Sequence, residues 1–137
     1  MEPRREEAVR RRMSGYNCAQ AVLCTYADQC GLSEEDLYRI SEGLGGGLGC
    51  CDGTCGALNA AVMLAGLKYS SGDPERLTRG TTMGIASAMT KKFREQAGAL
   101  RCRDLKGIDT GKVLCSCPDC VRIACDLAET YLYKEED

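Results

Sequence analysis

Cysteine is the residue type in this chain whose number and spacing could carry chemistry. Eleven cysteines stand among 137 residues, and histidine is absent. A chain without histidine has no Ser-His-Asp triad, no Cys-His nucleophile pair and no histidine-ligated metal. What remains for these side chains is thiol–disulfide exchange or the binding of a metal by thiolates. The cysteines are Cys18, Cys24, Cys30, Cys50, Cys51, Cys55, Cys102, Cys115, Cys117, Cys120 and Cys125.

The strongest local motif is the segment CSCPDC, residues 115–120. Residues 117–120 of this segment form a C-x-x-C motif in which Pro118 directly follows Cys117. Proline is typical of the first turn of a helix. At a helix start the two sulfurs can meet and a thiolate is stabilised, as a dithiol redox site requires. Zinc and iron–sulfur sites use the same spacing, so the motif alone leaves both chemistries open.

Two more cysteines directly follow residues that are good helix caps. Cys18 follows Asn17, and Cys55 follows Thr54. The unpaired backbone N–H groups and the helix dipole at such positions favour an anion. We therefore expect lowered thiol pKa values for these two cysteines, because the thiolate is the charged form.

The remaining cysteines divide by their neighbours. Cys102 stands between Arg101 and Arg103, whose charges are expected to favour its thiolate as well. Cysteine is also among the most buried residue types and often serves as a small apolar side chain. Simple core packing is expected for three cysteines that lie on apolar helical faces, Cys24, Cys30 and Cys125.

The elements that must position these cysteines are helical throughout. Apolar residues recur at helical spacing, and the predicted fold class is all-α: a single compact bundle of about five to six helices with a glycine-rich loop. The glycine-rich loop is GLGGGLGCCDG, residues 43–53. A second loop is expected over residues 106–116, and the last residues, KEED at 134–137, are expected to fray into solvent. The expected helices run from Pro3 to Gly15, from Cys18 to Cys30, from a Ser33 cap through Ile40, over residues 57–67 after a Thr54 cap, from Asp73-Pro74 to Gly98, and from Pro118 through Leu132.

Length and charge limit the function classes. A chain of 137 residues is expected to form one domain, a helical cysteine-rich domain over residues 1–137. Its formal charge of −2 argues against nucleic acid as a main partner. No apolar run is long enough for a membrane span, and the charged residues 1–15 lack the apolar stretch of a secretory signal. The expected location is therefore the cytoplasm, and a homodimer is compatible with the apolar helices.

Several longer stretches together resemble the C_GCAxxG_C_C family, whose members are described as redox-active proteins. The stretches are residues 15–22, the glycine run 43–49, residues 55–58, the segment from Phe93 to Gly107, and Cys120-Val121. The resemblance implies a redox role and places the four signature cysteines of the family on Cys18, Cys55, Cys102 and Cys120. The chain departs from the family pattern where the C-G-A-x-x-G element ends in Ala60 instead of glycine.

Three functions are compatible with these observations. The leading hypothesis is thiol–disulfide exchange without a cofactor. The expected partner is a thiol or disulfide of a protein or of a small molecule. Cys55 is the expected nucleophile, and Cys120 or Cys117 is its resolving partner. The second is binding of Zn²⁺ or an iron–sulfur cluster by the four signature cysteines, Cys18, Cys55, Cys102 and Cys120. The third is a helical interaction protein whose thiols are incidental and whose arginine-rich first helix docks an acidic partner.

Overall fold

The computed structural model describes residues 1–134, so the expected fraying of residues 135–137 lies outside the described part of the chain. The described residues form an all-α structure without a β-strand, as predicted. Seven regular α-helices are present in residues 1–134, and α4 is a short turn of four residues. The bounds are α1 (Arg5–Arg12), α2 (Cys18–Thr25), α3 (Glu34–Ser41), α4 (Gly45–Leu48), α5 (Gly56–Tyr69), α6 (Arg79–Ala97), α7 (Cys102–Lys106) and α8 (Cys117–Ala128).

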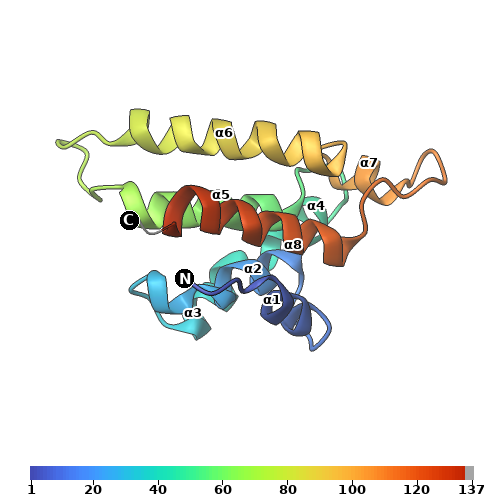
Figure 1. Ribbon diagram of the computed structural model, residues 1–137, viewed down its shortest axis with the longest axis horizontal. Helices are drawn as coiled ribbons and strands as arrows, with labels where there is room; N and C mark the ends of the chain where they lie inside the picture. Colours follow the sequence, from blue (N-terminus) through green and yellow to red (C-terminus); the bar gives the residue numbers. More distant parts are fainter. Residues whose placement is uncertain (135–137) are drawn as a thin grey trace.

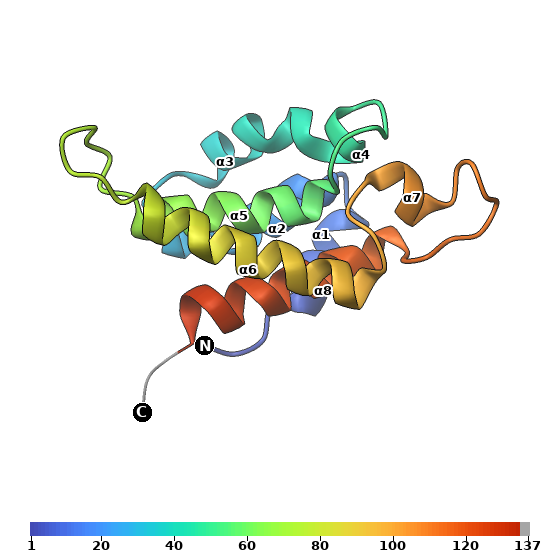
Figure 2. The same ribbon diagram turned by 90° about the horizontal axis from the view of Figure 1, so that it is seen from above.

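The helices pack in three layers (Figure 1). Helix α6 lies on one side of α5 and α8, and α1, α2 and α3 lie on the other side. Seen from above, α4, α7 and the loop after α7 gather at one end of the molecule, and the turn between α5 and α6 projects from the other (Figure 2). No helix in residues 1–134 is long and apolar enough to cross a membrane.

The core lies between α2, α5 and α8. Helix α5 is apolar on most of its faces and buries Leu58 and Leu64 almost completely. The predicted stripe of the last helix, from Val121 to Leu132, is buried against it. Tyr26 is fully buried and donates a hydrogen bond from its hydroxyl to a carboxylate oxygen of Glu129, 2.5 Å away. This arrangement fixes the direction of the three helices relative to one another.

Side-chain caps define where the helices of the site begin. The Asn17 side chain accepts a hydrogen bond from the Gln20 backbone N–H, and Gln20 bonds back to the Asn17 backbone, which completes a capping box at the start of α2. The Ser33 hydroxyl caps α3 by accepting from the Asp36 backbone N–H, and Ser116 caps α8 by accepting from that of Asp119, without the return bond of a capping box. The predicted starts of these helices are thus confirmed to within one residue, because a cap is a local interaction.

The first helix is shorter than predicted, Arg5–Arg12 instead of Pro3 to Gly15, and three further predicted boundaries were wrong. The fifth helix begins at Arg79, because the Asp73 side chain accepts from the Glu75 backbone N–H and closes a local turn instead of a helix. The second helix stops at Thr25, and a short 3₁₀ segment replaces its predicted end near Cys30.

The third correction concerns the start of α5. Cys55, not Thr54, is the residue at the N-cap position. Thr54 instead pairs with Arg101 in an isolated antiparallel bridge. Helix α7, which follows that bridge, was not predicted; it has five residues, too few to show a clear apolar period.

Candidate functional site

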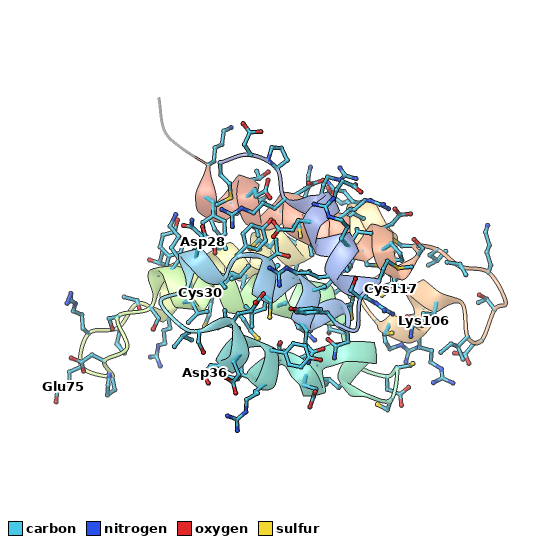
Figure 3. The ribbon with its side chains drawn as sticks, turned by 90° about the horizontal axis from the view of Figure 1, so that it is seen from below. Asp28, Cys30, Asp36, Glu75, Lys106 and Cys117 are labelled. Carbon is cyan, nitrogen blue, oxygen red and sulfur yellow. The ribbon has the colours of Figure 1, made fainter. Side chains whose placement is uncertain are left out.

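A small cavity of about 70 Å³ at the α4–α7 end of the bundle is lined by six cysteines. They include all five cysteines that the sequence nominated, and Cys115 as the sixth. Two basic residues, Arg12 and Lys106, also line the cavity, and its lining contains no carboxylate. Cys117 and Lys106 lie at this end of the molecule, whereas Cys30 lies toward the opposite end (Figure 3). The six are Cys18, Cys55, Cys102, Cys115, Cys117 and Cys120.

The starts of four helices bring these cysteines together. Cys18 is the first residue of α2, Cys102 the first of α7 and Cys117 the first of α8. Cys120 lies one turn into α8, and Cys55 occupies the N-cap position of α5. The free backbone N–H groups of several helices therefore face one cluster of sulfurs, which favours negative charge on some of them.

Cys18 and Cys117 form the first of two thiol pairs in the cavity. The Cys18 thiol donates a hydrogen bond to the Cys117 sulfur, and Arg12 Nε donates to the same sulfur from 3.2 Å. These contacts lower the pKa of Cys117 to about 5, with the bond from Cys18 as the largest cause. The lowered pKa expected for Cys18 was wrong: its pKa is raised, first because its proton is held by Cys117 and then because it is buried. Near neutral pH the pair is thus one thiolate and one thiol.

Cys55 and Cys120 form the second pair. The Cys120 thiol donates to the Cys55 sulfur, which lowers the pKa of Cys55, and the backbone N–H groups of Leu58 and Ala57 add to this effect. The pKa of Cys120 is raised by the same hydrogen bond and by burial. Both members of this pair are nearly inaccessible, Cys55 at 6% and Cys120 at 3% exposure, whereas Cys117 is half-buried. Of the two sulfurs with a lowered pKa, that of Cys117 is therefore the more reachable.

The flanking arginines do not activate Cys102 as the sequence predicted. Arg101 pairs with Asp104, 3.1 Å away, and Arg103 pairs with two aspartates on the surface. Burial raises the pKa of Cys102, and the positive charge of Lys106 only partly opposes this effect. The thiol form of Cys102 is therefore favoured.

Two glycines, Gly47 of the predicted loop and Gly56 at the start of α5, lie against cysteines of the site where a side chain could not fit. Gly47 has φ +61°, and a Cβ there would lie 2.5 Å from Cβ of Cys102. A Cβ on Gly56 would lie 2.8 Å from Sγ of Cys18 and 2.6 Å from the carbonyl oxygen of Leu44. All three distances are too short for a real contact, so these glycines allow the cysteine side chains to approach the backbone closely. The Gly46 backbone N–H uses this proximity and donates to the Cys18 sulfur.

The cysteines predicted to pack in the core lie away from the cavity. Cys24 and Cys125 are buried, and Cys30 is half-buried with its thiol 3.1 Å from the carbonyl oxygen of Tyr26. Burial raises the pKa of Cys24 to about 11 and that of Cys125 to about 12. Neither is therefore a ready nucleophile at neutral pH.

The arginines of the first helix are engaged within the chain. Arg4 pairs with Asp28, Arg5 with Asp126 and Arg11 with Glu34. Arg12 instead turns toward Cys117. Carboxylates of the same chain therefore pair with several of the arginines that were expected to dock an acidic partner.

The thiols of the cavity form one cluster in which Cys120 contacts both Cys55 and Cys115. Within residues 1–134, no group of three or more Cys, Asp or Glu side chains is arranged to hold a metal ion. All eleven cysteines are free. Both thiol exchange and metal binding therefore stay hypotheses for experiment.

Comparison with known proteins assigns the chain to a family. A family model described as "Putative redox-active protein (C_GCAxxG_C_C)" matches residues 16–131. The chain belongs to this family. The match spans all the cysteines that line the cavity, from the capping box of α2 to the end of α8. No curated protein and no solved structure matches the chain.

Membership in the C_GCAxxG_C_C family agrees with the placement of the cysteines. The four that the sequence resemblance marked as signature residues, Cys18, Cys55, Cys102 and Cys120, all line the cavity. Ala60, where the chain departs from the motif, is fully buried in α5.

Proposed function

We propose that this protein carries out thiol–disulfide exchange with Cys117 as the attacking thiolate and Cys18 as the resolving thiol. The observation that carries the proposal is the Cys18–Cys117 hydrogen bond beside the guanidinium of Arg12. A nucleophile in such chemistry must be a thiolate and must be reachable, and a second thiol must lie next to it. Cys117 has the low pKa and partial exposure, and buried Cys18 is its neighbour.

The reaction requires no group beyond the two cysteines and the substrate. The Cys117 thiolate attacks one sulfur of a substrate disulfide R–S–S–R′, forms the mixed disulfide Cys117–S–S–R and releases R′–S⁻. Cys18 then loses its proton and attacks the Cys117 sulfur, which forms the Cys18–Cys117 disulfide and releases R–S⁻. The substrate gains two electrons, the cysteine pair loses them, and the Cys18 proton passes to a released thiolate. The reverse sequence oxidises a substrate dithiol.

This assignment moves the nucleophile from Cys55, which the sequence favoured, to Cys117. Cys55 also has a lowered pKa, but its sulfur is almost completely covered. The Cys55–Cys120 pair is better suited to store a second disulfide than to meet a substrate first. The substrate class is a disulfide of a protein or of a small molecule, as expected from the sequence.

The test is a count of alkylated thiols by intact mass across a series of glutathione redox buffers. Labelling is done in denaturant with a chelator, so that a bound metal cannot protect thiols in the manner of a disulfide. We expect the loss of two labels at one midpoint, and peptide mapping should place that disulfide between Cys18 and Cys117. Cys117→Ser and Cys18→Ser should each abolish this transition, whereas Cys30→Ser, a cysteine far from the cavity, should leave it unchanged.

If all eleven cysteines are labelled at every buffer potential, no disulfide has formed, and the proposal is overturned for that range of potentials. A two-label transition that survives in Cys117→Ser would keep the redox function but remove Cys117 from its role. If all labels persist, metal analysis of anaerobically purified protein decides whether the second hypothesis takes its place.

A further inference from the structure

A third pair of cysteines lies at the outer edge of the cavity. Cys51 stands on the glycine-rich loop outside the cavity lining, and its sulfur accepts a hydrogen bond from the thiol of Cys102, which lines the cavity. Cys51 is half-buried, and its neighbour Cys50 is exposed. The pair therefore joins the loop surface to the interior of the site.

The backbone holds the two residues in this position. The Arg103 N–H donates to the carbonyl oxygen of Cys51 at 2.8 Å, and the Cys102 N–H donates to that of Gly53 at 3.0 Å. Cys51 has φ +67°, a left-handed conformation that non-glycine residues rarely adopt. Two backbone hydrogen bonds thus fix an unusual conformation that places the Cys51 thiol against Cys102.

The same stretch of backbone directs Cys102 and Cys55 toward the same side. Thr54 and Arg101 form an antiparallel bridge, and the Cys55 N–H donates to the carbonyl oxygen of Leu100 at 2.8 Å. Side chains alternate between the two faces of paired extended segments, so Cys55 and Cys102 point away from the side of Thr54 and Arg101. Both line the cavity, as this geometry requires.

We propose that Cys51 and Cys102 form a second, surface-facing dithiol, through which the buried Cys55–Cys120 pair exchanges its disulfide with a partner protein that carries a reactive dithiol. This inference rests on the proposed function. The cavity of about 70 Å³ is small, so a small thiol can enter it more readily than a cysteine carried by a folded protein. Neither Cys55 nor Cys120 is exposed by more than 6%, and a disulfide between them needs an intermediary to reach the surface.

The exchange balances within the chain. Cys102, once deprotonated, attacks the Cys55 sulfur of the Cys55–Cys120 disulfide and releases the Cys120 thiolate. Cys51 then attacks the Cys102 sulfur, forms the Cys51–Cys102 disulfide and releases the Cys55 thiolate. The protons lost by Cys51 and Cys102 pass to the released thiolates, and two electrons move inward without an external oxidant. The partner dithiol afterwards reduces the Cys51–Cys102 disulfide and is itself oxidised.

The test begins with fully reduced protein that receives a limiting amount of glutathione disulfide. Samples are quenched with acid at successive times, alkylated in denaturant and mapped as peptides. We expect the Cys55–Cys120 disulfide to decay as the Cys51–Cys102 disulfide grows, at a rate that does not depend on protein concentration. In Cys51→Ser the Cys55–Cys120 disulfide should persist, and Cys50→Ser, the exposed neighbour, should behave as the wild type.

A second arm follows the return of electrons to the oxidised protein. Reduced thioredoxin serves as the protein dithiol and dithiothreitol as the small one. Reduction by thioredoxin should slow in Cys51→Ser and stay at the wild-type rate in Cys50→Ser, whereas reduction by dithiothreitol should change little in either. Equal thioredoxin rates for Cys51→Ser and the wild type would overturn the inference.

The outcomes separate this inference from the proposed function. If the Cys18–Cys117 disulfide forms in the wild type but Cys51 is labelled as a free thiol at every time, the second dithiol is refuted and the proposed function stands. If the Cys18–Cys117 disulfide never forms, the proposed function fails. In that case the time course of the wild type decides on the second dithiol: a Cys51–Cys102 disulfide that grows as the Cys55–Cys120 disulfide decays retains it, and the absence of a Cys51–Cys102 disulfide removes it.

Discussion

Replacement of Arg12 by alanine is expected to raise the pKa of the Cys117 thiol. In the native protein this pKa lies at about 5, and the guanidinium contributes a hydrogen bond at 3.2 Å and a positive charge. A hydrogen bond to a charged group stabilises by roughly 1.5–3 kcal/mol, and one pKa unit corresponds to about 1.36 kcal/mol. Because Cys117 is only half-buried, solvent screening keeps the effect near the lower end of that range, about one unit. The expected pKa in Arg12→Ala is therefore about 6.

The hydrogen bond from Cys18 makes the larger contribution, so its removal should have the larger effect. Cys18→Ala is expected to raise the pKa of Cys117 further than Arg12→Ala does. Arg10→Ala is the matched control, because Arg10 lies on the same helix, is exposed and does not line the cavity. It should leave the titration of Cys117 unchanged.

The assay measures the rate at which iodoacetamide labels Cys117 in reduced protein, resolved by peptide mass, between about pH 4 and pH 9. Only the thiolate reacts, so the rate rises with pH through the pKa and then levels off. A native midpoint at the ordinary cysteine value would refute the assignment of Cys117 as a resting thiolate. An unchanged midpoint in Arg12→Ala would show that the guanidinium does not stabilise the thiolate, and would refute the electrostatic part of the reasoning.

Three further predictions concern packing and stability, each measured by urea denaturation in the presence of reductant. Gly56→Ala should lower the free energy of unfolding by about 1–3 kcal/mol, since the added Cβ has no room, and should slow formation of the Cys18–Cys117 disulfide. Gly66→Ala is the control, because Gly66 lies on the same helix with open space around it. This substitution should raise the free energy of unfolding by about 0.5–1 kcal/mol. Phe93→Ala should cost about 3–5 kcal/mol, because the ring is fully buried, and a cost below about 1 kcal/mol would contradict that burial. Ser116→Ala should cost about 1 kcal/mol through loss of the cap on α8, and an unchanged free energy would show that the cap is dispensable.

Local signals in the sequence predicted most of the helices. The caps Asn17 and Ser33, Pro118 at the start of the last helix and Gly98 at the end of α6 each act within a few residues, so their effect can be recognised without knowledge of the rest of the chain. The apolar stripe of the last helix was predicted for the same reason. All of these features are found in the structure.

The errors occurred where one local pattern is compatible with two structures. Asp73 followed by proline is typical of a helix start and equally of a turn, and the exposed residues after it offer no core contact that favours the helix. The isolated bridge between Thr54 and Arg101 joins segments far apart in sequence, so the local pattern around either residue could not reveal it. Helix α7 starts directly after that bridge and ends at Gly107, which has a left-handed conformation.

The sequence by itself determined that cysteines stand at the starts of several helices, where backbone N–H groups favour thiolates. Only the tertiary structure decided which sulfurs meet and which of them holds the negative charge. Arg12 and Cys117 are 105 residues apart, and they touch because α1 packs on α8. Arg101 and Arg103 flank Cys102 in sequence, yet their charges are directed to aspartates. Electrostatic effects on a thiol depend on distance in space and on burial, and both are set by the packing of the helices rather than by the order of the residues.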